Sequence, residues 1–105
     1  MIKKIKQIPE SELGETDLIA VLPGIHYPHI KDNLNEPIVS DDFLPGLGDY
    51  AAYFCQTSSN VKFAIMVPLE VLPPVEIDIY SNDKNNLNEI LAELEIEFSE
   101  DIKTE

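Results

Sequence analysis

Prolines constrain the fold of this chain more than any other residue type, because eight of its 105 residues are proline and all of them lie before residue 75. Proline lacks a backbone N–H and clashes with the preceding helical turn, so it breaks the interior of a helix. The stretch from residue 9 to residue 74 is therefore predicted to hold no long helix. The prolines stand at positions 9, 23, 28, 37, 45, 68, 73 and 74.

Apolar segments between these prolines have the composition of β-strands. Residues 17–22 (DLIAVL) form a short apolar run that ends at Pro23, and residues 36–39 favour a second, shorter strand. Residues 50–56 and 61–67 are rich in aromatic and β-branched side chains, and four polar residues join them. This pattern predicts a β-hairpin.

Residues 75–80 (VEIDIY) alternate between apolar and polar side chains. The alternation predicts a strand that places Val75 and the two following isoleucines on a buried face. Glu76 and Asp78 are expected on the opposite face, which would be solvated and acidic.

The segment after residue 85 has the period of an amphipathic helix. Asn86 is predicted to cap this helix, and Glu89 is predicted to return a hydrogen bond to the backbone of the cap. The helix is predicted to run to about Phe98. Residues 94–98 also alternate as a strand would, so the alternative is a helix that stops near Leu94 and continues as a strand. Its apolar stripe consists of Leu87, Ile90, Leu91, Leu94 and Phe98.

These segments together predict an α+β fold. We expect a small single domain over residues 1–105, with an antiparallel β-sheet packed against a C-terminal α-helix. Apolar residues make up 44% of the chain, which is enough for one hydrophobic core despite the high charge.

Acidic residues dominate the charge of the chain. There are 20 Asp and Glu against seven Lys and no Arg, which gives a formal net charge of −13. Nucleic acids and anionic membranes are bound by clustered cations, so we expect neither direct nucleic-acid binding nor membrane binding. No apolar run reaches the roughly 18 residues of a membrane-spanning helix. The partner expected for such a surface is a basic protein.

A row of glutamates accompanies the predicted helix, at Glu89, Glu93, Glu97 and Glu100. These positions share one side of a helix, whereas Glu93, Glu95 and Glu97 would share one face if the segment were a strand. Either arrangement predicts an acidic ridge.

A second acidic region lies between residues 26 and 49, where aromatic residues accompany the carboxylates. Aromatic anchors ringed by polar groups dominate interface energetics, so the energetic centre of a partner-binding surface is expected here. The candidate partner-binding residues are Tyr27, Asp32, Glu36, Asp41, Asp42, Phe43 and Asp49, together with Glu89, Glu93 and Glu97 of the ridge.

Catalytic signatures are missing from the sequence. It contains neither a G-x-S-x-G nucleophile turn nor a G-x-x-x-x-G-K-[ST] phosphate loop. Without arginine, bidentate binding of phosphate or carboxylate substrates is not possible. We therefore expect no enzymatic activity, no catalytic residues and no cofactor.

The two histidines and the one cysteine give no strong metal signal. His26 and His29 have a spacing that converges on a metal in a helix, but Pro28 is expected to prevent a continuous helix there. A turn that includes Asp32 would be needed, so no metal site is predicted. Cys55 is expected to be a buried thiol in a strand, and a chain without a disulfide fits the cytoplasm.

The sequence thus favours an acidic, stoichiometric protein inhibitor of the immunity-protein, antitoxin or phage-inhibitor type. Its expected partner is a basic protein, most plausibly a nuclease toxin or a nucleic-acid-binding protein, which electrostatic steering would help it to find. Two alternatives remain: a small metal- or ligand-binding module around His26 and His29, and a non-catalytic subunit of an oligomer.

Overall fold

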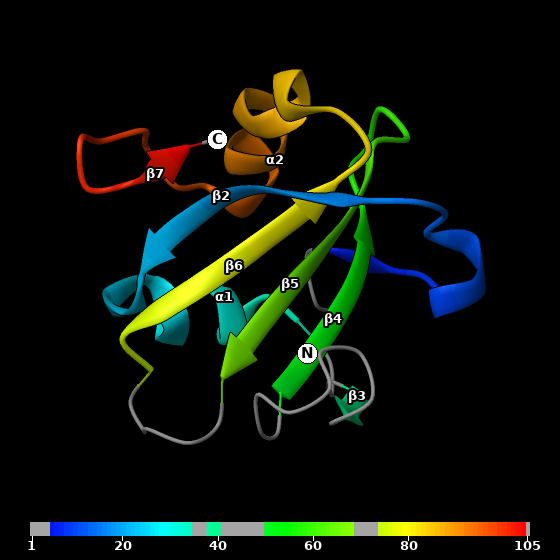
Figure 1. Cartoon of the computed structure of the whole chain (residues 1–105), viewed down its shortest axis with the longest axis horizontal. Helices are drawn as coiled ribbons and strands as arrows, with labels where there is room; N and C mark the ends of the chain where they lie inside the picture. Colours follow the sequence, from blue (N-terminus) through cyan, green and yellow to red (C-terminus); the bar gives the residue numbers. More distant parts are fainter. Residues whose placement is uncertain (1–4, 35–37, 41–49, 69–73, 105) are drawn as a thin grey trace.

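An antiparallel sheet forms the centre of the structure, a computed structural model that describes residues 5–34, 38–40, 50–68 and 74–104 (Figure 1). The strands follow the order β1-β4-β5-β6-β2-β7, and β3 also pairs with β4. Every one of these pairings is antiparallel. The strands are β1 (Lys6–Gln7), β2 (Asp17–Pro23), β3 (Ile38–Ser40), β4 (Tyr50–Gln56), β5 (Lys62–Pro68), β6 (Glu76–Ser81) and β7 (Lys103–Thr104).

The predicted hairpin is confirmed as the pair β4 and β5. Tyr53 lies opposite Ile65 in its register. In the connecting turn, Thr57 N donates to Val61 O over 2.8 Å, and Asn60 takes a φ of 74°. Asparagine tolerates this left-handed conformation better than most residues, which explains its place at the end of the turn.

Two helices cover one face of the sheet, and α1 lies behind the sheet in the view of Figure 1. They are α1 (Tyr27–Asp32) and α2 (Leu87–Leu94), and both bury isoleucine or leucine side chains in the main core. The main core also takes the inward residues of the strands, among them Leu22, Phe63, Ile65, Ile77 and Ile79. The α+β architecture with an antiparallel sheet packed against a C-terminal helix is therefore confirmed.

A second, smaller core lies on the opposite face of the sheet. Phe54 of β4 and Met66 of β5 are buried there, because Ile8 and Leu13 of the N-terminal segment pack over them. Strands β4 and β5 are thus apolar on both faces, which is typical of strands covered on both sides.

The predicted end of the C-terminal helix is wrong. Helix α2 ends at Leu94, and Glu95 takes the left-handed conformation with φ 57° and ψ 43°. Ile96 N then donates to Leu91 O over 2.9 Å, as in a Schellman C-cap. This reversal buries Ile96 and leaves Phe98 59% exposed. Burial of Ile96 offsets the cost of about 1–2 kcal/mol for a left-handed non-glycine residue.

The start of α2 is predicted correctly at Asn86, but the expected side-chain cap does not form. A 3₁₀ turn, Lys84–Asn86, precedes the helix, and Asn86 already has helical dihedral angles. Its Nδ2 donates instead to Ser81 Oγ and Asn82 Oδ1, over 3.1 and 2.9 Å. Asp83 caps the turn, because its Oδ1 accepts from Asn85 N over 2.9 Å.

Two further expectations are corrected. Pro28 does not prevent a helix, because it lies in the first turn of α1, where a missing N–H costs nothing. Val75 precedes β6 and is 72% exposed rather than buried. In the described ranges of the chain, no helix has the length and apolar character that crossing a membrane requires.

Candidate protein-interaction surface

Five of the predicted partner-binding residues lie in or beside the two helices. Tyr27 and Asp32 belong to α1, Glu89 and Glu93 belong to α2, and Glu97 follows the end of α2. The helices meet where His29 of α1 donates from Nε2 to Leu94 O of α2, over 2.8 Å. The remaining five predicted residues, Glu36, Asp41, Asp42, Phe43 and Asp49, lie outside the described residues.

Neither of the two arrangements predicted for the glutamate ridge forms. Both proposed arrangements, one helical side or one strand face, require a regular element through Glu97. The chain instead leaves the helix at Glu95, and residues 95–98 are neither helix nor strand. Glu89 and Glu97 are both exposed, but no single regular element aligns them.

Glu93 has a structural contact that the sequence did not indicate. Its Oε1 accepts from Ser58 N over 3.0 Å and from Ser58 Oγ over 3.2 Å. Ser58 lies in the turn between β4 and β5, so this carboxylate ties the hairpin to α2. Glu93 is therefore partly committed to the fold rather than free for a partner.

The side chain of Tyr27 mainly holds α1 against the main core. The residue is half-buried and packs against the main core. Burial raises the pKa of the Tyr53 hydroxyl, and the charge and hydrogen bond of Tyr27 raise it further, so the two hydroxyls are neighbours. On its outer side, Lys31 Nζ lies 5.9 Å from the Tyr27 ring centroid, within cation–π range.

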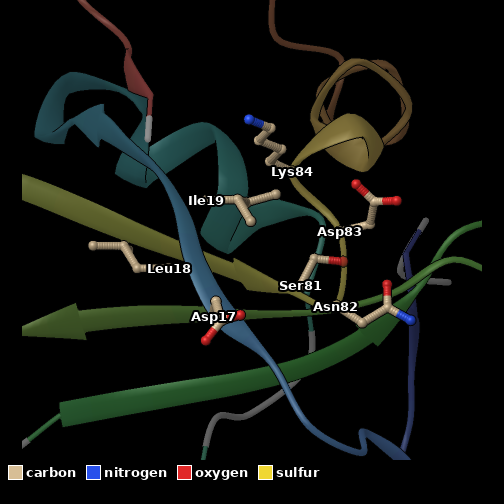
Figure 2. Close-up of a pocket in the computed structure, with 7 residues that line it drawn as sticks. All are labelled: Asp17, Leu18, Ile19, Ser81, Asn82, Asp83 and Lys84. Carbon is tan, nitrogen blue, oxygen red and sulfur yellow. The ribbon is translucent and has the colours of Figure 1, made fainter.

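A hollow of about 420 Å³ lies where β2 begins and β6 ends (Figure 2). Ser81 at its base is buried, and its hydroxyl donates to Lys62 O over 2.9 Å and accepts from Asn86. This hydroxyl thus holds neighbouring strands together and is not poised as a nucleophile. The hollow is lined by Asp17, Leu18, Ile19, Ser81, Asn82, Asp83 and Lys84.

A second hollow of about 590 Å³ shares Asn82 and Asp83 with the first. Among its other lining residues, Asn60 accepts from Gln56 Nε2 over 2.7 Å, and Asn86 donates to Asn82. Its amide groups therefore stabilise the turns around it.

Metal binding gains no support from the described residues. His29 uses its Nε2 for the bond to Leu94 O. No group of three His, Cys, Asp or Glu side chains in the described part of the chain is arranged to hold a metal ion. Cys55 is fully buried, as predicted, and burial raises the pKa of its thiol, which keeps it protonated.

Nearly all carboxylates of the described residues face solvent. Asp78 and Glu93 are half-buried, and every other described Asp or Glu is exposed. Burial raises the pKa of Asp78, and the neighbouring charge of Glu76 raises it further. The described surface therefore presents negative charge on several sides and can attract a cationic partner over long range.

The exposed apolar residues of this surface were not predicted from the sequence. Ile25, Val75 and Phe98 are 81%, 72% and 59% exposed. The one local signal for Val75 was the pair of prolines directly before it, which delays the start of β6.

Comparison of the chain with family models, with curated proteins and with solved structures found no match.

Proposed function

We propose that this chain is an acidic, stoichiometric protein inhibitor that binds a basic protein partner and blocks its cationic surface. The observation that carries the proposal is the solvent exposure of the described carboxylates, in a chain with a net charge of −13. Self-repulsion of this size opposes a compact fold, and a cationic partner relieves it.

The chemistry of the partner follows from the same charge. Nucleases and other nucleic-acid-binding proteins present clustered Lys and Arg to phosphate groups, and a carboxylate-rich surface complements such clusters. We therefore propose the immunity-protein, antitoxin or phage-inhibitor type, acting without turnover on a nuclease toxin or a nucleic-acid-binding protein. The protein itself would bind neither nucleic acid nor membrane. The single cysteine cannot form an intrachain disulfide, which is consistent with a proposed site of action in the cytoplasm.

Capture from native cells, followed by titration, tests this proposal. The affinity-tagged chain is used as bait, the captured protein is identified and purified, and its activity is measured against increasing amounts of the chain. We expect a partner with a pI above about 9 whose activity falls linearly and is abolished at one equivalent.

The double variant Glu89→Lys/Glu97→Lys serves as a comparison, because both residues are exposed. It should slow association and flatten the dependence of the association rate on salt. A captured partner of acidic pI, or an activity that an excess of the chain leaves unchanged, would contradict the proposed function.

A further inference from the structure

Among the described residues, the second core covers only part of the sheet face opposite the helices. Over β4 and β5, Ile8 and Leu13 complete the second core, which reaches β6 only at Tyr80. The rest of this face, formed by β6, β2 and β7, belongs to neither core among the described residues. Figure 1 looks onto the sheet with α1 behind it, so β6 and β2 cross the front of the view.

The strand registers define which side chains this open face carries. Val21 of β2 pairs with Asp78 of β6 and with Lys103 of β7. Pro23 pairs with Glu76 one step further along. Cross-strand partners point to the same side of a sheet, so these five residues share the face away from the helices.

One end of the open face is apolar and held in a fixed geometry. Gly24 N donates to Val75 O over 2.8 Å, which joins the segment that carries Ile25 to the start of β6. A Cβ atom on Gly24 would lie 1.7 Å from Pro74 O, so only glycine permits this approach. The contact places Ile25 and Val75, the two most exposed large apolar residues of the described chain, on adjoining segments.

A hollow of about 410 Å³ lies on this part of the surface. Val21, Leu22 and Pro23 of its lining are buried or half-buried, whereas its acidic residues, Glu76 and Asp101, are exposed and define its rim. The hollow is lined by Val21, Leu22, Pro23, Val75, Glu76, Asp101 and Lys103.

The charge of the open face determines which chemical groups of a partner it can bind. Among the described residues, Glu76, Asp78 and Asp101 are accompanied there by one cation, Lys103, whose Nζ lies 3.6 Å from Glu76 Oε2. Strand β2 lies between β7, which carries Lys103, and β6, which carries Glu76, so this ammonium group reaches across β2 to a carboxylate of the face. Burial and the charge of Glu76 together raise the pKa of Asp78, which agrees with an excess of negative charge around it.

We propose that the open face of β6, β2 and β7 docks a basic segment of a protein partner. A Lys or Arg side chain of that segment would lay its aliphatic stem on Val21, Pro23 and Val75 and place its cation beside the carboxylates of the rim. Long basic side chains combine apolar and charged contacts in this way. The inference rests on the proposed function and names the surface and the partner chemistry through which it acts.

The test uses a peptide of defined chemistry and the full chain. A blocked pentapeptide of alternating lysine and leucine is titrated into the isotope-labelled chain, and amide chemical shifts are followed. We expect saturable shifts centred on Val21, Val75, Glu76 and Lys103. An otherwise identical peptide with glutamate in place of lysine should cause none, and one with serine in place of leucine should bind more weakly.

Variants locate the binding surface. Glu76→Lys should weaken binding of the lysine–leucine peptide by about tenfold. Val75→Ser removes an apolar contact without adding charge and should also weaken binding. Glu12→Lys makes the same charge reversal as Glu76→Lys at an exposed residue that precedes Leu13 of the second core, and it should change the affinity by about twofold or less. Circular dichroism checks that each variant is folded.

Shifts centred on α2, no saturable binding at millimolar peptide, or equal affinities for Glu76→Lys and Glu12→Lys would each overturn the docking face. Its failure is distinguishable from failure of the proposed function. If a basic partner is captured and inhibited but binds Val75→Ser and Glu76→Lys unchanged, the function stands and the docking face is wrong. If the peptide binds at the face but the captured partner is not basic, the docking face stands and the function is wrong.

Discussion

Strands β4 and β5 are buried on both faces, whereas β2 and β6 are fully buried only on the face that meets the helices. In β5 the five residues from Phe63 to Val67 are all buried, while in β6 buried residues alternate with half-buried or exposed ones. The sequences differ in the same way, since FAIMV is continuously apolar and EIDIY alternates. The pattern of apolar residues in each strand therefore indicates whether its second face is covered.

The uncovered half is also where carboxylates and exposed apolar side chains lie together. Glu76 and Asp78 are the polar side chains that a solvated sheet face normally carries, so they alone do not set this half apart. What sets it apart among the described residues is that Val75, 72% exposed, directly precedes Glu76.

On the face opposite the helices, a side chain of β4 in the second core should contribute more to stability than a side chain of β2. Phe54 is 3% exposed beneath Ile8 and Leu13, so Phe54→Ala should lower the free energy of unfolding by about 3–5 kcal/mol. Leu18 is half-buried on the same face of β2, so Leu18→Ala should cost about 1 kcal/mol or less. Urea unfolding monitored by circular dichroism measures both. Equal losses would show that the two halves are covered alike.

Replacing Gly24, which lies at one end of the open face, should destabilise the fold. Gly24→Ala places a methyl group against the Pro74 carbonyl and should break the bond from Gly24 N to Val75 O, at a cost of about 1–3 kcal/mol. Ile25→Ala at the adjacent, exposed position should stay within about 0.5 kcal/mol of the parent protein. Thermal melts compare the two variants. If Gly24→Ala melts like Ile25→Ala, the contact between the two segments does not fix the open end.

The strands and the hairpin were predictable from the sequence because their signals are local. Alternation, β-branched runs and turn residues act over a few neighbours, and they located β2, β4, β5 and β6 to within one residue. The end of α2 was not predictable in this way, since both Ile96 and Phe98 satisfy an apolar pattern after Leu94. Which of them is buried depends on the tertiary core, and Ile96 occupies that place.

The acidic character of the described surface followed from composition, but its exposed apolar residues and its geometry did not. Both depend on contacts between residues that are distant in the chain. Glu93 meets Ser58, 35 residues away in the chain, and Gly24 meets the backbone of Val75. No periodicity within one segment reports such contacts. For the same reason, an acid such as Glu93 and an acid such as Glu76 look equivalent in the sequence.

The contact of Glu93 should distinguish it from the other glutamate on α2. Glu93→Ala removes the acceptor of two hydrogen bonds from Ser58 and should lower the free energy of unfolding by about 1 kcal/mol. Glu89→Ala removes an exposed charge one helical turn away and should be neutral or stabilise by about 0.2–0.5 kcal/mol. Ser58→Ala in the Glu93→Ala background should cost less than in the parent protein. Additive losses in this cycle would mean that the two residues act separately.

Asp78→Asn should have the smallest effect on the free energy of unfolding. The sign of this effect shows whether the folded protein disfavours or stabilises the ionised carboxylate on the open face. Its folded-state pKa is raised, by burial and by Glu76, so ionisation of this carboxyl is penalised in the folded protein. The penalty is fully present above the folded-state pKa and disappears below the ordinary pKa of aspartate, about 3.9. Asp78→Asn should therefore raise the free energy of unfolding at pH 7, and the gain should shrink as the pH falls through the folded-state pKa. Chemical unfolding of both proteins from pH 7 to pH 3.5 measures this difference.

An outcome of opposite sign would be equally informative. If Asp78→Asn destabilises the protein at pH 7 and the loss fades toward acid pH, the ionised carboxylate is stabilised within the fold, as by a cation such as Lys103. The open face would then be electrostatically satisfied without a partner. Glu76→Gln separates the two cases, because removing its charge should lower the pKa of Asp78 and reduce the gain from Asp78→Asn only if repulsion between these two acids causes the shift.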